Sequence, residues 1–289
     1  MDARTAQSTP DVSSQLASLT AAEIDLLTFS ELVGCVNEPN MPSGGGATVR
    51  RVIELARPRP GVPILEVGSN TGFTSIEIAS WVDAPVTGID VNANSNAFAA
   101  AKARAYGIEN VEFVEADGAR MPFPDESFGL VFCSNVTSFM QDHVRARDEY
   151  YRVLATKGII AAVPIYYART PPDDLRRSVE AAIGASLPLT SRAYWRDLFS
   201  DPRAVLICDE EYEYVPQEPR RIVAYADRVM QQSHLHELPD RLREALHRRL
   251  VYFYELFDRN LEYARYSIML FRLDHPNPEP VLHETRRGA

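Results

Sequence analysis

Short β-rich runs alternate with helical segments between Val62 and Val163. The predicted strands are 62–67, 86–90, 111–114, 130–133 and 159–163, and predicted helices near 73–82, 94–106 and 144–154 separate most of them. Strands joined through helices pair in parallel with right-handed crossovers, which places helices on both faces of one sheet. The sequence therefore predicts an α/β, Rossmann-like, doubly wound sheet with a ligand site beyond the carboxyl ends of its strands.

The first predicted strand runs into a glycine turn that opens a helix, over residues 64–73. Gly68 and Gly72 let the backbone approach a ligand closely, and the amides at the helix start favour a polar, partly anionic ligand. A dinucleotide fingerprint would need glycine at positions 68, 70 and 73, but Asn70 and Phe73 stand at two of them. A nicotinamide or flavin site is therefore disfavoured. Asn70 is still able to adopt a left-handed backbone.

Across about 47–163 the chain resembles the class I S-adenosylmethionine-dependent methyltransferases of the small-molecule type. Asp90 ends the second strand, where the family places an acid that accepts both ribose hydroxyls. Asp117 follows the third strand, where the family places an Asp near the adenine amino group. The chain departs from the family at Gly129, where Asp is usual, and keeps only Gly158 of a common Pro-Gly-Gly.

This resemblance implies S-adenosylmethionine as the cofactor. The positively charged sulfonium makes its methyl group electrophilic, so the protein has to align the acceptor in line and exclude water. The cofactor-binding residues that the resemblance implies are Glu66, Gly68, Ser69, Asn70, Gly72, Asp90, Val91, Asn92, Asp117, Gly118, Ser134 and Asn135.

The segment after the fourth strand limits the class of molecule that can accept the methyl group. Residues 133–136 match neither the Asn/Asp-Pro-Pro-aromatic element of amino-methylating DNA enzymes nor the Pro-Cys element of cytosine enzymes, and they lack the acidic pair of magnesium-dependent catechol enzymes. We expect a metal-free enzyme of natural-product biosynthesis that acts on a small molecule. O-methylation is preferred, with N- or C-methylation as alternatives. His143 is the candidate base, unless Asp142 only caps a helix and His143 faces solvent. His234, His236 and Glu38 are weaker candidates.

Aromatic and acidic side chains near the predicted cleft are candidates for binding the acceptor. Tyr166 and Tyr167 follow the fifth strand, and Glu38 lies in a loop that continues into the glycine run 43–46. Core packing explains the tyrosines equally well. The glycine run precedes a helix with two arginines, which makes it either an anion site or a plain hinge.

The segments outside this core predict a cap and a lid. We expect an N-terminal helical cap over 1–46, with one helix from Thr20 towards Cys35, and a core over 47–273 with seven strands and an antiparallel last strand. Helical insertions at about 166–200 and 217–261 would form the lid. The first dozen residues and the tail 274–289 are expected to be flexible.

Composition limits the partners. The formal net charge of −10 leaves no excess of cations for nucleic acid. The three cysteines form no closely spaced pair, and no apolar run is long enough for a bilayer, so we expect a soluble, cytoplasmic protein. Its expected partner is a small molecule. The sequence allows a homo-oligomer but does not determine the number of subunits. Two rival functions remain. One is a related sulfonium-using enzyme that transfers another group, and the other is a methyltransferase-like protein that binds a metabolite without turnover.

Overall fold

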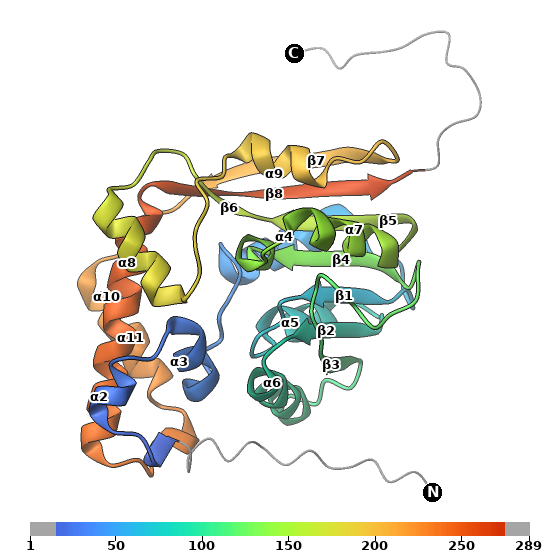
Figure 1. Cartoon of the computed structure of the whole chain (residues 1–289). Coiled ribbons are helices and arrows are strands. Elements are labelled where there is room, and N and C mark those ends of the chain that lie inside the picture. Colours follow the sequence, from blue (N-terminus) through green and yellow to red (C-terminus); the bar gives the residue numbers. More distant parts are fainter. Residues whose placement is uncertain (1–15, 275–289) are drawn as a thin grey trace, which may run out of the picture.

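One eight-stranded sheet organises the chain in the computed structural model, which describes residues 16–274 (Figure 1). Its strands are β1 Ile64–Val67, β2 Val86–Asp90, β3 Val111–Glu115, β4 Phe128–Ser134, β5 Leu154–Val163, β6 Ile165–Tyr167, β7 Ala204–Glu213 and β8 Ala264–Leu273. The order is β3-β2-β1-β4-β5-β8-β6, and β7 pairs with β8. The first five strands pair in parallel, whereas β8 is antiparallel to β5, β6 and β7. The predicted α/β fold is confirmed.

The eighth strand corrects the expectation of seven. β5 ends at Val163 and β6 begins at Ile165, so Pro164 separates two segments that both pair with β8. Proline has no amide hydrogen to donate and interrupts a ladder. The extra strand is therefore a short continuation of β5 beyond this proline.

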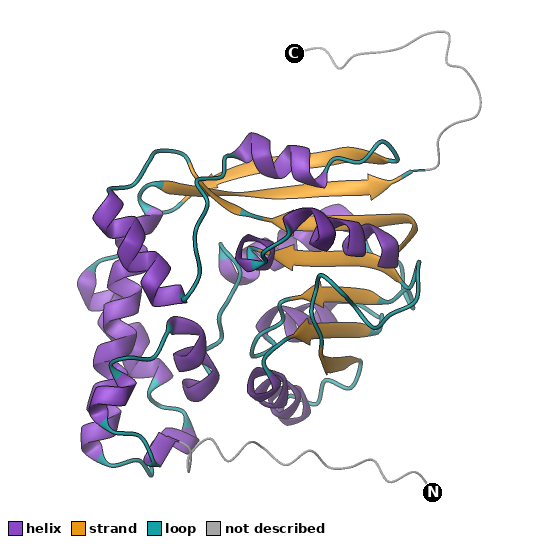
Figure 2. Cartoon of the chain, in the orientation of Figure 1, coloured by secondary structure: helices purple, strands orange, loops and turns teal. Residues whose placement is uncertain are grey.

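Helices cover both faces of the sheet, as Figure 2 shows in purple against orange. The helices are α2 Ala21–Ile24, α3 Phe29–Val36, α4 Gly45–Ala56, α5 Phe73–Trp81, α6 Ala93–Ala105, α7 His143–Val153, α8 Asp173–Ile183, α9 Arg192–Phe199, α10 Pro219–Val229 and α11 Asp240–Leu261, with 3₁₀ turns η1 Val136–Phe139 and η2 Ser233–Leu235. Tyr151 of α7 and Trp195 of α9 belong to the apolar cluster on one face. Val52 of α4 and Ile78 of α5 belong to the cluster on the other. Within the described part of the chain, no helix has the length and apolar content to cross a membrane.

The single helix expected from Thr20 is two helices. Thr20, where the helix was expected to begin, caps α2 with a capping box that includes Glu23. Thr28 then forms a second capping box with Glu31 and starts α3 in a new direction. Because a Ser or Thr cap satisfies free amides at a helix start, this second cap favours a break at residue 28.

Five helices gather beside the sheet and form a helical layer with its own apolar cluster. α2, α3, α8, α10 and α11 contribute buried residues to this cluster, among them Leu32, Val179, Ala226, Leu250 and Phe253. Figure 1 shows these helices stacked together at the end of the sheet to which the arrowhead of β4 points. The helical layer therefore faces the carboxyl ends of the parallel strands. The expected tail lies almost wholly in residues 275–289, outside the described part of the chain.

Candidate functional site

The loop between β1 and α5, here called the first turn (residues 68–72), has the backbone that a close-fitting ligand site requires. Gly68, Asn70 and Gly72 all lie in the left-handed region, at φ 81°, 45° and 84°. Asn70 thus adopts the conformation foreseen from the sequence. A Cβ on Gly68 would lie 2.7 Å from the Val136 Cβ in η1. Glycine is therefore needed at position 68 both for its backbone and for the segment that packs over it.

Asp90 ties this turn to the end of β2. Its Oδ2 accepts a hydrogen bond from the Asn70 amide at 3.0 Å, and its Oδ1 accepts one from the Asn92 amide at 2.9 Å. Burial raises the pKa of Asp90, and these two amides oppose the rise. Each oxygen of an ionised carboxylate can accept a further hydrogen bond. The next residue, Val91, is 69% exposed although it is apolar, so it offers an open surface to a ring.

Glu66 lies beneath the first turn. Its carboxylate is buried and accepts a hydrogen bond from the Ser75 hydroxyl of α5. Burial raises the pKa of Glu66 to about 7, whereas the hydrogen bonds from Ser75 and Thr74 lower it. In the turn itself, the Ser69 hydroxyl is buried and has no hydrogen-bond partner among residues 16–274. Glu66 is thus tied to the start of α5, and Ser69 retains an unused polar group.

The loops after β3 and β4 lie beside the same strand ends. Asp117 is exposed, and its Oδ1 accepts from the Ala119 amide at 2.8 Å. A Cβ on the buried Gly118 would lie 2.6 Å from Val67 Cγ1, at the end of β1. After Ser134, the left-handed Asn135 donates its amide to the Val163 carbonyl at 3.1 Å. The structure therefore gathers the predicted cofactor residues at the carboxyl ends of β1 to β4.

His143 lies at the start of α7 within an aromatic group. Asp142 caps the helix through the Arg145 amide at 2.9 Å, as the alternative reading foresaw. The His143 ring is half-buried rather than open to solvent, and it stacks on Trp195 with 5.3 Å between ring centroids. His143 Nδ1 lies 2.6 Å from the Tyr194 hydroxyl. Burial lowers the pKa of His143 and favours its neutral form. Sequence reasoning missed Tyr194 and Trp195, since no local signal links positions about 50 apart.

The two tyrosines proposed for the acceptor have partners inside the protein. The Tyr166 hydroxyl lies 2.7 Å from Glu211 Oε1 and 2.8 Å from Ser267 Oγ, and the residue is 4% exposed. The half-buried Tyr167 donates to Asn260 Oδ1 at 3.0 Å. Both hydroxyls are therefore engaged in this structure.

Glu38 and His234 lie where the helical layer meets the sheet. Glu38 is buried, and its carbonyl accepts from the Thr71 hydroxyl in the first turn at 2.6 Å. His234 Nε2 lies 2.9 Å from the Cys35 carbonyl, and its ring packs against Phe98 of α6. His236 is exposed after η2. Of these three residues, the structure places Glu38 in contact with the first turn.

The arginines after the glycine run have acidic partners. Arg51 forms a two-pronged pair with Glu210 of β7, and Arg50 lies 3.6 Å from Glu77 of α5. Gly44, at φ 77°, starts α4 in the left-handed conformation. This arrangement agrees with a structural role for the run at the start of α4.

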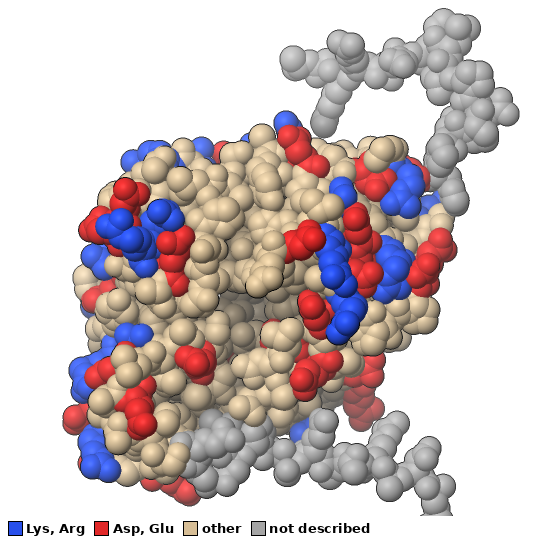
Figure 3. All heavy atoms as spheres, in the orientation of Figure 1, with Lys and Arg blue, Asp and Glu red and all other residues tan. Residues whose placement is uncertain are grey.

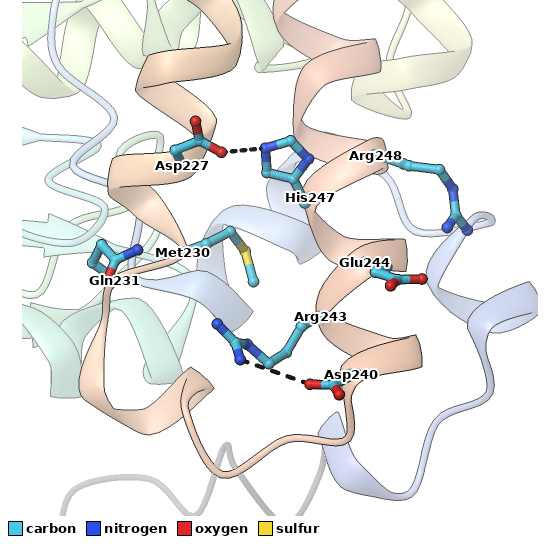
Figure 4. Close-up of a pocket in the computed structure, with 8 residues that line it drawn as sticks. All are labelled: Asp227, Met230, Gln231, Asp240, Arg243, Glu244, His247 and Arg248. Carbon is cyan, nitrogen blue, oxygen red and sulfur yellow. Dashed lines mark hydrogen bonds and ion pairs between the residues drawn. The ribbon is translucent and has the colours of Figure 1, made fainter.

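Figure 3 shows a hollow on the face between the helical layer and the sheet, with few charged atoms in view around it. A small cavity of about 10 Å³ at the end of β4 is lined by Cys133, Asn135, Thr137, Ser138, Ala162, Pro164, Trp195 and Phe199. A larger groove of about 510 Å³ lies between α10 and α11 (Figure 4). In this groove, Asp227 Oδ1 lies 2.9 Å from His247 Nε2. That groove shares no lining residue with the first turn and is a separate feature of the helical layer.

Comparison with known proteins agrees with the geometry of the strand ends. Residues 65–162 match the family model described as "Methyltransferase domain". The demethylmenaquinone methyltransferase of Thermus thermophilus is 36% identical over 134 residues, which cover 45% of the chain and 60% of that protein. Sterol methyltransferase-like 1 of Botryococcus braunii is 33% identical over 124 residues, covering 43% of the chain and 31% of that protein. The chain spans at most 60% of the length of the first curated relatives it matches.

Solved structures share the fold. The MccD protein superposes with a TM-score of 0.67 at 23% identity, over 81% of this chain and all of that one. The [4+2]-cyclase SpnF gives 0.64 at 20% identity, over 88% and 94%. A geranyl diphosphate methyltransferase in complex with S-adenosylmethionine gives 0.56 at 15% identity, over 79% and 85%. The family match begins in β1 and contains the first turn, Asp90 and Asp117. Residues 65–162 are therefore a methyltransferase domain of the class I S-adenosylmethionine-dependent type, and S-adenosylmethionine is the cofactor of that domain.

Proposed function

We propose that this chain transfers the methyl group of S-adenosylmethionine to a small-molecule acceptor by in-line displacement. The observation that carries this proposal is the left-handed first turn joined to the Asp90 carboxylate through the Asn70 amide. When bound, the cofactor supplies an electrophilic methyl group on a positively charged sulfur. The reaction needs no nucleophile from the protein. The role of the chain is therefore to align the acceptor with the methyl group and to shield both from water.

The residues at the strand ends fit this cofactor. Asp90 retains acceptor capacity for the two ribose hydroxyls, and the exposed Val91 offers an apolar surface to the adenine ring. Asp117 is exposed and available to an amino group, beside the tightly packed Gly118. The unpartnered Ser69 hydroxyl suits the polar methionine end. We assign these residues to cofactor binding on that basis.

For the acceptor, we propose an uncharged and largely apolar molecule. The hollow in Figure 3 has few charged atoms around it. Phe139 of η1, Leu189 before α9 and Tyr194 of α9 are exposed large side chains on segments near His143. Pockets for small molecules are mostly apolar with few polar groups. The relatives named for sterol and demethylmenaquinone methylation support this class, and natural-product biosynthesis remains our proposed setting.

We place the proton acceptor, where one is needed, at His143. A hydroxyl acceptor loses its proton during methylation, and the neutral imidazole hydrogen-bonded to Tyr194 is suited to receive it. O-methylation is therefore our preference, whereas a neutral amine or a carbon nucleophile would depend less on this pair. The His143→Ala variant tests the assignment. A large fall in kcat with unchanged cofactor affinity would support it, and wild-type turnover would remove His143 from the mechanism.

Calorimetric titration with S-adenosylmethionine, followed by mass spectrometry of candidate acceptors, tests the function as a whole. We expect cofactor binding and an acceptor that gains one methyl group. Tight cofactor binding without a methylated product on any apolar acceptor would favour the non-catalytic binding protein instead. Absence of cofactor binding would contradict the proposed methyl transfer.

A further inference from the structure

A buried carboxylate joins the helical layer to the first turn. Glu38 follows α3 and is 4% exposed. Its Oε1 accepts from the Tyr225 hydroxyl of α10 at 2.7 Å, and its Oε2 accepts from the Asn40 amide at 2.5 Å. Burying a charged group is costly unless it is paired and hydrogen-bonded. The hydrogen bonds from Tyr225 and Asn40 therefore offset part of the cost of burying this carboxylate.

The main chain of Glu38 reaches the cofactor side of the same junction. Its carbonyl accepts from the Thr71 hydroxyl at 2.6 Å. Thr71 is fully buried and lies between Asn70 and Gly72, whose left-handed backbones shape the first turn. The Thr71 carbonyl accepts from Lys102 Nζ of α6 at 2.9 Å. One residue thus contacts both α10, through its side chain, and the first turn, through its main chain.

Burial disfavours the charged forms of Glu38 and Lys102 at this junction, and their mutual attraction offsets part of that effect. Burial raises the pKa of Glu38, and the nearby Lys102 ammonium lowers it. Burial lowers the pKa of Lys102 to about 8, and Glu38 opposes that change. The Tyr254 hydroxyl of α11 is also buried near this carboxylate, which raises the pKa of the phenol. Groups from α6, α10, α11 and the loop after α3 therefore meet around one acid.

We propose that Glu38 is a positioning residue that couples the helical layer to the cofactor turn. We call the contacts Tyr225–Glu38–Thr71 the Glu38 bridge. When the cofactor orders the first turn, the Glu38 bridge also orders α10. When α10 loses its contact with Glu38, the first turn is less ordered. Cofactor binding should therefore order α10 even though that helix supplies no residue to the predicted cofactor set. The inference rests on the proposed function for its purpose, but its test needs only cofactor binding.

The test uses Glu38→Gln and Tyr225→Phe in the full chain. Cofactor affinity is measured by calorimetry, and amide hydrogen exchange is followed with and without S-adenosylmethionine. In the wild type, we expect the cofactor to slow exchange both at residues 68–72 and in α10. In the two variants, affinity should fall about tenfold, as for one lost charged hydrogen bond. Protection should persist at the turn and be lost in α10. If Glu38 and Tyr225 only stabilised the fold, their substitution would change exchange protection alike at residues 68–72 and in α10.

Matched variants control for general damage. Tyr106→Phe removes a hydroxyl from an exposed tyrosine, and Glu244→Gln neutralises an exposed acid of α11. Both should behave as the wild type. If Glu38→Gln fails to fold, Tyr225→Phe alone still decides the question. Wild-type affinity and α10 protection in Tyr225→Phe would overturn the bridge alone. A wild type that does not bind the cofactor would overturn the proposed function and the bridge with it.

Discussion

At the scale of single residues, Asp90 holds the first turn through the Asn70 amide and the start of α6 through the Asn92 amide. In the proposed complex, its remaining lone pairs accept hydrogen bonds from the ribose. Asp90→Ala should weaken S-adenosylmethionine binding by about 1 to 3 kcal/mol, since charged hydrogen bonds are lost. Asp90→Asn, which keeps one acceptor oxygen, should lose less. Titration calorimetry measures both, with the exposed Asp83→Ala as the control. Unchanged affinity in Asp90→Ala would mean that the ribose lies elsewhere.

Glu66 predicts a pH dependence of stability. Burial raises its pKa to about 7 in the folded chain, from an ordinary value of 4.5. Between these values the native state binds more protons than the unfolded state, so the free energy of unfolding falls as pH rises through this window. The full change should be about 3 kcal/mol. Denaturant unfolding of the cofactor-free protein at pH 5 and pH 8 measures it.

Glu66→Gln should remove this slope and gain stability relative to the wild type at pH 8. Glu109→Gln, at an exposed position, is the matched control and should keep the wild-type slope. An identical pH dependence in the wild type and Glu66→Gln would show that the buried acid does not take up a proton as described.

At the level of secondary-structure elements, α9 packs into the apolar cluster on one face of the sheet. Trp195 is 1% exposed, stacks on Phe199 and donates its ring N–H to Thr190 Oγ1 at 3.0 Å. Trp195→Ala should lower the free energy of unfolding by about 3 to 5 kcal/mol, because it opens a cavity in the core. Trp81→Ala, at a residue that is 54% exposed, should change it far less. Denaturant unfolding compares the two, and equal losses would contradict this packing role for α9.

Local patterns in the sequence predicted most elements. The strand predicted over 86–90 has the observed bounds, the second helical insertion ends at Leu261 as expected, and a helix begins directly after Thr20. The fifth strand ends at Val163 as predicted, but the short strand after Pro164 and the new cap at Thr28 were missed.

The first turn of the candidate site could be predicted from the sequence, whereas the contacts between distant residues could not. The first turn is encoded by adjacent residues, so Asn70 could be given its left-handed backbone before the structure was known. The pairing of Glu38 with Tyr225 joins positions 187 apart, and that of His143 with Tyr194 joins positions 51 apart. Such contacts arise from the packing of whole helices and produce no periodic pattern of residues in the sequence.

At the scale of the whole molecule, the helical layer and the sheet have separate apolar clusters that meet at the strand ends. A ligand that binds the folded chain there should stabilise the whole molecule. At a concentration 100 times its Kd, S-adenosylmethionine should raise the free energy of unfolding by about 2.7 kcal/mol. Thermal unfolding measures the shift, with NAD at the same concentration as the control. An equal shift with NAD would contradict the assignment of the first turn.

The most direct measurement is a crystal structure of the chain with S-adenosylhomocysteine, the demethylated form of the cofactor. We expect density across the carboxyl ends of β1 to β4, with the ribose hydroxyls on the Asp90 carboxylate and the adenine ring against Val91. Ligand density at another place, such as the groove between α10 and α11, and none at the first turn, would contradict the proposed cofactor site.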